Sequence, residues 1–212
     1  AGGGATAAFT AGVLASHSVT ISNTGSFTLT ATKTAGTETG TSNAFTVNSA
    51  PSSSVKVGSF TKSGAVGTQT IAHGLGEVPK AIILWTTGKT NESFSARYLF
   101  GFGMSDGTTS LSVAASSDDS AVTTSNAARR MADKVLTIVN GDTQLLAEAD
   151  LSSWDGTNVT LNWTTNNAAA YVIHYIAIGG SGVSAKVINW QMPTGTPPIL
   201  HPVTGVGFRP NV

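Results

Sequence analysis

The stretch SFSARYLFGFG, residues Ser93 to Gly103, decides the fold class of this chain. Aromatic or small apolar residues occupy every second position of it, at Phe94, Ala96, Tyr98, Phe100 and Phe102. A period of two is typical of a β-strand, because successive side chains point to opposite faces. The stretch therefore predicts one long strand with one packed face.

The same period recurs along the chain. It predicts strands in Ser26–Thr32, Phe45–Val47, Val55–Phe60, Thr68–His73, Ala81–Thr87, Thr109–Ser116, Lys134–Asn140, Thr143–Asp150, Asn158–Trp163 and Ala169–Gly180. Turn-forming pairs separate several of them, at Asp106-Gly107, Asn140-Gly141 and Asp155-Gly156. Short strands divided by such turns favour an all-β protein built as an antiparallel sandwich. Ser125–Lys134 is the one helical candidate, with Ser125 as its cap.

The composition limits the classes of partner. Charged residues make up 10% of the 212, against about 25% in ordinary domains, and 11 basic residues balance 11 acidic ones. Such a chain has no summed field to attract nucleic acid or an anionic membrane, so we expect neither as a partner. No apolar run approaches the roughly 18 residues of a membrane span. There is no cysteine, which excludes disulfides and thiolate chemistry. The small-polar bias favours an extracellular setting.

The chain is expected to contain three parts: residues 1–50, residues 51–185 and residues 186–212. The first boundary lies in the linker-like NSAPSSS, Asn48 to Ser54. The second comes from an internal repeat, because aligning Pro210 with Pro79 also pairs Gly205 and Gly207 with Gly74 and Gly76. The same alignment, with one inserted residue, places KVINW (Lys186–Trp190) on KVGSF (Lys56–Phe60). Both ends look cut, which indicates either a window on a longer polypeptide or strands supplied by a neighbouring chain.

The segment Thr24–Asn48, TGSFTLTATKTAGTETGTSNAFTVN, resembles the C-terminal half of bacterial immunoglobulin-like modules of surface and phage structural proteins. The resemblance implies that residues 1–50 are the C-terminal part of such a domain.

Residues 55–180 resemble a repeat of tailed-phage structural proteins. The resemblance depends on VKVGSFTKS, HGLGEVPKAIILW, FGFGMSDGT, the stretch from AEADLSSW to AIGG, and the closing PVTGVGFRPNV. More loosely, the opening VKVGSF strand and the closing LNWTTNNAAAYVIHYIAIGG resemble the H-type lectin sandwich, a six-stranded module that tends to trimerise. These resemblances imply a sandwich repeat, a homo-oligomer with three copies as the plausible number, and a start of a second copy at 186–212.

Candidate ligand-binding residues follow from side-chain chemistry. Trp154, beside a turn, is the tryptophan most available to stack on a sugar ring, or else a packed corner. Trp163 and Trp190 lie in strand patterns and are expected in the core. Asp118 and Asp119 could bind calcium, or lie in a solvated loop. Arg129 and Arg130 could pair with that loop, face an acidic partner, or form a plain surface pair.

Catalytic patterns are missing from the sequence. None of its histidines (His17, His73, His174 and His201) has a metal-ligand spacing, and there is no GxSxG motif. His174 is expected to be a packed or hydrogen-bonded residue of the sandwich.

We therefore expect no enzyme and no obligatory cofactor. The leading hypothesis is a structural component of a tailed-phage virion, a fibre, head-fibre or capsid-surface protein that contacts other virion subunits and could bind host-surface carbohydrate. The alternative is a prokaryotic cell-surface adhesin or extracellular filament subunit assembled by strand exchange. A third reading is the accessory lectin domain of a carbohydrate-active enzyme.

Overall fold

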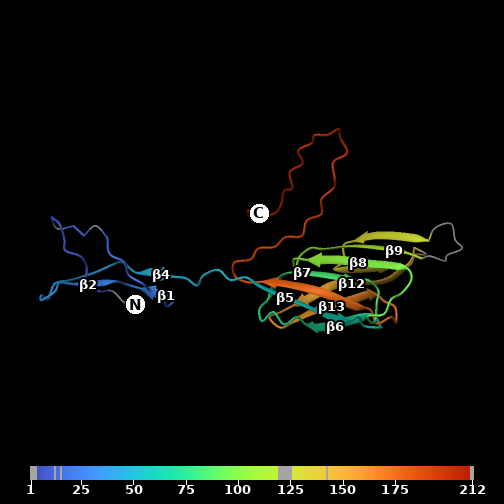
Figure 1. The fold of residues 1–212 in the computed structure, drawn as a ribbon, viewed down its shortest axis with the longest axis horizontal. Coiled ribbons are helices and arrows are strands. Elements are labelled where there is room, and N and C mark those ends of the chain that lie inside the picture. Colours follow the sequence, from blue (N-terminus) through green and yellow to red (C-terminus); the bar gives the residue numbers. More distant parts are fainter. Residues whose placement is uncertain (1–3, 12, 15, 119–125, 142, 211–212) are drawn as a thin grey trace. The chain divides into compact units, whose positions relative to one another are not determined.

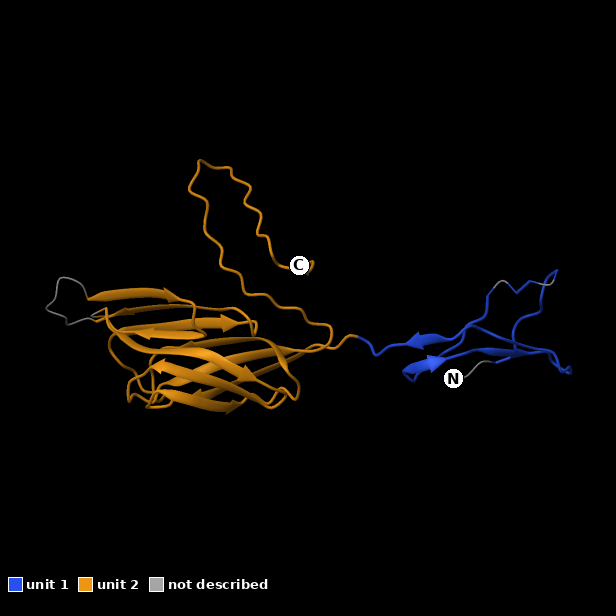
Figure 2. Ribbon diagram, turned by 180° about the vertical axis from the view of Figure 1, so that it is seen from behind, with its two compact units in different colours: residues 1–50 blue, residues 51–212 orange. Residues whose placement is uncertain are grey.

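The computed structural model describes residues 4–11, 13–14, 16–118, 126–141 and 143–210. Its described part holds fourteen strands and no helix, which confirms the all-β prediction (Figure 1). The chain divides into two compact units, residues 1–50 and residues 51–212 (Figure 2). Each unit is a separate structure with its own sheets.

Unit 1, residues 1–50, consists of two small sheets. β1 (Gly25–Phe27) pairs with β4 (Phe45–Val47), and β2 (Thr30–Thr32) pairs with β3 (Thr39–Thr41). The single strand expected over Ser26–Thr32 is wrong, because the ladder breaks where the Leu29 amide donates to Ser42 Oγ at 2.9 Å. None of the described residues of this unit is fully buried. Unit 1 therefore has no core of its own among these residues.

Unit 2 is a sandwich of two antiparallel sheets. The six-stranded sheet has the order β10-β9-β8-β7-β14-β5, and the four-stranded sheet has the order β11-β12-β13-β6. The strand bounds are β5 (Ser54–Thr61), β6 (Gly67–Ala72), β7 (Pro79–Thr86), β8 (Tyr98–Ser105), β9 (Ser110–Ser117), β10 (Ala127–Ala132), β11 (Leu136–Val139), β12 (Leu145–Trp154), β13 (Asn158–Thr165) and β14 (Val172–Gly179). The three predicted turns lie between β8 and β9, β11 and β12, and β12 and β13. The prediction of an antiparallel sandwich is confirmed.

The core of unit 2 lies between the two sheets. Leu84 and Ile173 come from the six-stranded sheet, and Ile138, Leu161 and Trp163 come from the four-stranded sheet; none is more than 1% exposed. The indole Nε1 of Trp163 donates to Gln69 Oε1 at 2.9 Å, so its polar atom is satisfied in the core. The expectation that Trp163 is a core residue is confirmed.

Strand β8 departs from its prediction in two ways. It begins at Tyr98, not Ser93, because Arg97 has a left-handed backbone (φ 74°) that ends the extended run. Its glycines Gly101 and Gly103, not its aromatic residues, face the core. A Cβ on Gly101 would lie 2.6 Å from the carbonyl oxygen of Thr137, and one on Gly103 would lie 2.1 Å from that of Val135. Two glycines therefore let the backbone of the opposite sheet approach β8 closely, and the aromatic rings point outward.

The helix expected over Ser125–Lys134 is wrong. Residues Ala127–Ala132 form β10, and all six pair with Ser112–Ser117 of β9. Each pairing satisfies backbone groups that an isolated short helix would leave unsatisfied at its ends. Tertiary pairing therefore overrides the local preference of this segment, while Ser125 itself lies outside the described residues.

The strand expected over Lys186–Trp190 is also wrong, since residues 186–210 contain no strand. Within the sandwich, β5 pairs only with β14. Residues 186–210 contain no counterpart of β14, so the segment aligned with β5 has no ladder partner among the described residues. The four glycines that the repeat alignment pairs nonetheless share one backbone geometry: Gly74, Gly76, Gly205 and Gly207 have φ of 66°, 82°, 82° and 79°.

Candidate functional site

The outer face of the four-stranded sheet is polar. Its outward positions on β6 and β13 are occupied by Thr68, Thr70, Thr160, Asn162 and Thr164. Two of these hydroxyls, on Thr70 and Thr160, form a hydrogen bond of 3.2 Å across the strands. Water can solvate such a surface without cost, so this face needs no partner.

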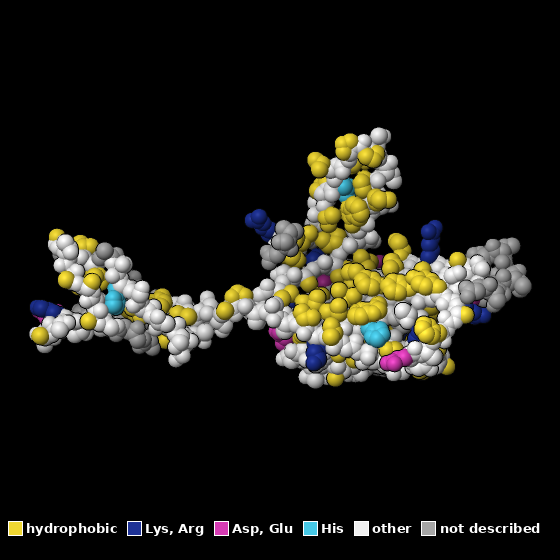
Figure 3. All heavy atoms as spheres, in the orientation of Figure 1, with side chains coloured by type: hydrophobic (Ala, Val, Ile, Leu, Met, Phe, Trp, Pro, Cys, Tyr) yellow, Lys and Arg dark blue, Asp and Glu magenta, His cyan; other side chains and the backbone are white. Residues whose placement is uncertain are grey.

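The outer face of the six-stranded sheet is apolar. Its strand register aligns residues in rows across the sheet: one row is Val57, Ile176, Ile83, Met104 and Leu111, and the next is His174, Trp85, Phe102, Val113 and Met131. Figure 3 shows hydrophobic side chains spread over the strands of this sheet. We call it the apolar face, and define it by Val55, Val57, Ile83, Trp85, Phe100, Phe102, Met104, Leu111, Val113, Met131, Ile176 and Ile178.

The aromatic residues of the apolar face are ordered against one another. The rings of Trp85 and His174 stack with centroids 5.6 Å apart, and those of Phe100 and Phe102 stack at 6.3 Å. His174, which was expected to be a packed or hydrogen-bonded residue of the sandwich, is exposed, and its ring contacts that of Trp85 on the outer face. Met131, Val57 and Val113 remain 74%, 64% and 51% exposed.

The area of the apolar face is large for a solitary protein. Six strands about 4.8 Å apart, each contributing roughly 20 Å of length, give on the order of 600 Å². The largest exposed apolar patch of a typical monomer is about 300–600 Å² and is often functional. Arg129, at the β10 edge, is the one charged residue at the outward positions of these strands in the described part of the chain.

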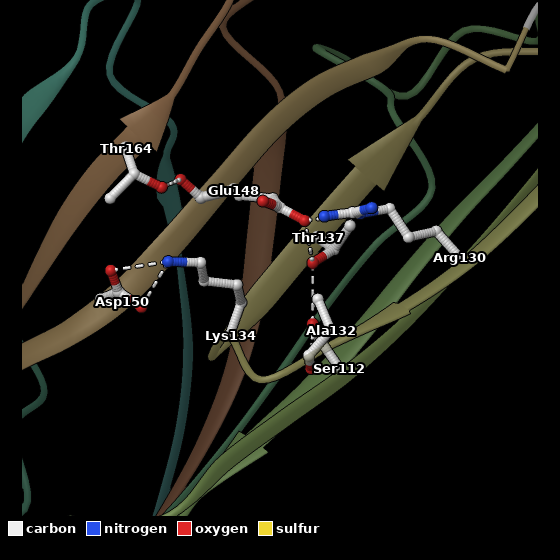
Figure 4. A network of polar contacts seen from close by, with 8 residues as sticks. All are labelled: Ser112, Arg130, Ala132, Lys134, Thr137, Glu148, Asp150 and Thr164. Carbon is white, nitrogen blue, oxygen red and sulfur yellow. Dashed lines mark hydrogen bonds and ion pairs between the residues drawn. The ribbon is translucent and has the colours of Figure 1, made fainter.

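The predicted pair Arg129 and Arg130 is divided by the structure. Arg129 is exposed on the outer side of β10, whereas the Nε of Arg130 donates to Glu148 Oε1 at 2.7 Å (Figure 4). The side chain of Glu148 is only 7% exposed, and Thr137 Oγ1 donates to the same carboxylate oxygen at 3.4 Å. The hydrogen bond and the charge of Glu148 raise the pKa of Arg130. Arg130 therefore neutralises a buried carboxylate between the sheets.

Replacing Arg130 with alanine is expected to lower the free energy of unfolding by about 2 kcal/mol, because the buried Glu148 carboxylate loses its cation. The value lies below the ~3–5 kcal/mol for fully buried pairs, since the Arg130 side chain is 46% exposed. Arg129→Ala is the matched control and should change stability by less than about 0.5 kcal/mol. Urea unfolding followed by tryptophan fluorescence measures both, and equal effects of the two variants would contradict this role.

The other predicted ligand residues do not form one site. Trp154 lies at the turn end of the β8–β9 hairpin, where a Cβ on Gly107 would be 2.5 Å from its ring, so it is a half-buried packed corner. Asp118 lies at the opposite end of that hairpin, next to Ser117, with Oδ1 3.5 Å from Arg97 Nε. Asp119 lies outside the described residues. In the part of the chain that the structure describes, no three His, Cys, Asp or Glu residues gather.

A hollow of about 890 Å³ lies at the Asp118 end of the sandwich. The loop from Thr87 to Arg97 forms much of its wall, together with Tyr98, Ser116 and Asn140. The sequence did not reveal this loop, because the alternation of Phe94 and Ala96 with polar residues continues the pattern of β8. The sequence signal for this loop was the polar run KTNES, Lys89 to Ser93, which lies within it.

Lys62 is a second charged group between the sheets, and it has no carboxylate partner. It is 2% exposed, and its Nζ donates to the carbonyl oxygens of Ser63 and Asn167 at 2.9 and 2.8 Å and to the Asn166 side chain. Burial lowers the pKa of Lys62 to about 8. The oxygens that accept these hydrogen bonds belong to Ser63, next to Lys62, and to the β13–β14 connection, so Lys62 links these two segments.

Asp106 ties the segment after β14 to the sandwich. Its Oδ1 accepts hydrogen bonds from the amides of Thr108 and Thr109, and its Oδ2 accepts one from Val187 at 2.9 Å and lies 3.1 Å from Lys186 Nζ. Val187 is thereby held at 7% exposure. Trp190, which was expected in the core, is 47% exposed; its ring meets His201 edge-on at 5.5 Å.

The attachment of Val187 is expected to weaken in acid. Burial alone would raise the pKa of Asp106, but the amides of Thr109, Val187 and Thr108 together with Lys186 outweigh it and lower the pKa from 3.8 to about 2. A carboxyl whose folded pKa is depressed stabilises the structure above its unfolded pKa, and this contribution is lost as pH falls from about 4 through about 2. The amide resonance of Val187 should titrate in that window. Asp106→Asn should abolish the titration and Asp155→Asn should not; a flat Val187 signal in the unaltered chain would refute the link.

Comparisons with known proteins add no relative: no family model, no curated protein and no solved structure matches this chain. The described residues include no helix long and apolar enough to cross a membrane.

Proposed function

We propose that this chain is a non-enzymatic structural component of a tailed-phage virion, a fibre, head-fibre or capsid-surface protein, whose sandwich associates with copies of itself through the apolar face. The observation that carries the proposal is the contrast between the two outer faces of unit 2. One is lined by threonine and asparagine, and the other by aromatic and aliphatic residues in register. In a module that stays monomeric, the apolar face would remain exposed to water, which is unfavourable.

The size of the apolar face supports an interface. Covering about 600 Å² on each of two copies removes roughly 1,200 Å² from water, the lower bound of stable specific interfaces. The apolar face contains aromatic and methionine residues (Trp85, Phe100, Phe102, Met104 and Met131), the types enriched where proteins meet. The burial of this surface is the driving force that we propose for assembly.

The partner that we propose is another copy of this chain. The formal net charge is zero, so copies do not repel one another, and no cluster of charge on the apolar face calls for a partner of opposite sign. The resemblance to trimeric H-type lectins favours three copies. Placement on a phage particle rests on the sequence resemblance of residues 55–180 to a tailed-phage repeat. The positive φ shared by Gly74, Gly76, Gly205 and Gly207 supports the internal repeat.

One observation favours the filament alternative. Lys186–Trp190 aligns with β5 yet has no ladder partner, and β5 itself is an edge strand with Val55 and Val57 exposed. A segment that aligns with an edge strand but pairs with no described strand, and an open sheet edge, are the two requirements for strand exchange between subunits.

Immunogold electron microscopy of the source material tests the proposal, with an antibody raised against residues 55–184. Gold on tailed, DNA-filled particles is the expected result, and its position on head or tail would separate decoration from host attachment. Gold along cell-surface fibres with bare particles would overturn the phage proposal in favour of the filament.

A further inference from the structure

The hollow at the Asp118 end of unit 2 has the dimensions and the rigidity of a ligand site. Its volume, about 890 Å³, lies within the roughly 300–1,000 Å³ of small-molecule pockets. The loop that walls it is fixed at its base, where the Val172 amide donates to the Lys89 carbonyl at 2.8 Å and the Gly88 amide donates to Thr86 Oγ1 at 3.1 Å. Within the loop, the Ser93 amide donates to Asn91 Oδ1 at 3.0 Å. The site is therefore largely preformed.

Two aromatic rings of the hollow are turned to solvent. Phe94 is fully exposed, at 105%, and Tyr98 is 54% exposed. Exposure of the Phe94 ring to water is unfavourable, and no described residue packs on it. Flat aromatic surfaces in this setting match the apolar C–H face of a pyranose.

Two polar groups of the hollow lack hydrogen-bond partners among the described residues. Ser116 is 4% exposed, and its Oγ has no hydrogen-bond partner in the described structure. A buried hydroxyl without a partner is rare in native proteins and points to a group that arrives from outside. Asn91 uses its Oδ1 for the turn, so its side-chain amide NH₂ is directed to no described acceptor.

Among the residues that the structure describes, the charges that line the hollow cancel. Its lining contains Lys89 and Arg97 against Glu92 and Asp118. Arg97 is close to Asp118, and the Nζ of Lys89 donates to Ser95 Oγ. With no net field, the hollow has no preference for a phosphate or another anion. It suits an uncharged ligand that carries many hydroxyl groups.

We infer that the hollow binds a neutral carbohydrate, with Phe94 and Tyr98 stacking on the sugar ring and Ser116, Asn91 and Asp118 hydrogen-bonding its hydroxyls. This inference deepens the proposed function, because it rests on the surface role above and names the site and ligand class of host contact. A single module should bind weakly, and several copies on one particle would add their contacts through multivalency.

Titration of the purified, ¹⁵N-labelled full chain with the methyl glycosides of glucose, galactose, N-acetylglucosamine and rhamnose tests the inference. At least one glycoside should shift amide resonances of residues 91–98 and 116–118 with millimolar affinity. Phe94→Ser should weaken that binding at least tenfold, or about 1.4 kcal/mol, and Ser116→Ala should weaken it independently. Phe9→Ser is the matched control, since Phe9 is also exposed, at 61%, but lies in unit 1.

Shifts outside the hollow, no shift with any of the four glycosides, or unchanged binding by Phe94→Ser would each overturn the inference. Phe94 has no packing to lose, so its replacement does not endanger the fold. The titration uses the purified chain and does not depend on a virion, and the immunogold labelling does not depend on sugar binding. A failure of the carbohydrate site and a failure of the virion role therefore give different results.

Discussion

Gly103→Ala is expected to destabilise unit 2 by about 3 kcal/mol or more. The new Cβ would lie 2.1 Å from the carbonyl oxygen of Val135 and 2.9 Å from Ser112 Cβ, so the clash is with backbone that cannot move aside. Overpacking a core usually costs about 1–3 kcal/mol, and a backbone obstacle places this substitution at the upper end. Urea unfolding measures the loss, and all four tryptophans, Trp85, Trp154, Trp163 and Trp190, report on unit 2.

Gly156→Ala is the matched control for this prediction. A Cβ on Gly156 would meet its nearest neighbour, in Glu77, at 3.8 Å, which is ordinary contact. The control should retain the stability of the unaltered chain within about 0.5 kcal/mol. If Gly103→Ala unfolded at the same urea concentration as Gly156→Ala, the close approach of the two sheets at β8 would be refuted.

Val113→Asp is expected to prevent self-association while leaving the fold intact. Val113 is 51% exposed and lies between Phe102 and Met131 in the middle of a row of the apolar face. In an assembled interface, its carboxylate would be buried without a partner, which is strongly unfavourable. The apparent dissociation constant should rise at least about 100-fold, or ~2.7 kcal/mol. Sedimentation velocity over a range of protein concentrations measures it.

Thr68→Asp is the control for the charge itself, because Thr68 is exposed on the polar outer face of the other sheet. This variant should associate like the unaltered chain. Equal dissociation by both variants would indicate a general effect of added charge and would contradict the role of the apolar face.

The strands and turns of unit 2 could be predicted because their signals are local. Alternation marks β13, nearly continuous apolar runs mark β7 and β14, and the pairs at Asp106, Asn140 and Asp155 mark three hairpins. Two of these aspartates accept hydrogen bonds from amides two and three residues further on, which is a property of the turn sequence itself.

The face of β8 that points to the core could not be predicted. Alternation shows that the two faces of a strand differ, but it does not show which of them is buried. Phe100 and Phe102 are apolar enough to be core residues, yet the inward positions belong to Gly101 and Gly103. The choice depends on the backbone of residues 135–137, at the start of β11 and just before it, which is distant in sequence.

The candidate ligand residues illustrate the same limit. Arg129 and Arg130 are adjacent in sequence, but their side chains lie on opposite sides of an edge strand and have unrelated roles. Trp154 and Asp118 are separated by the length of a hairpin. The hollow, by contrast, exists because Phe94 lies in a loop and not in β8. The left-handed backbone of Arg97, which ends the strand, has no sequence signature.

Oxidative footprinting of methionines tests the central claim, self-association through the apolar face, most directly. The chain has three methionines, and Met131 on the apolar face and Met192 outside it are 74% and 72% exposed in a single chain. At a concentration where the unaltered chain is assembled, Met131 should be oxidised much more slowly than Met192, and the difference should vanish in Val113→Asp. Equal oxidation of Met131 and Met192 in the unaltered chain would contradict the account.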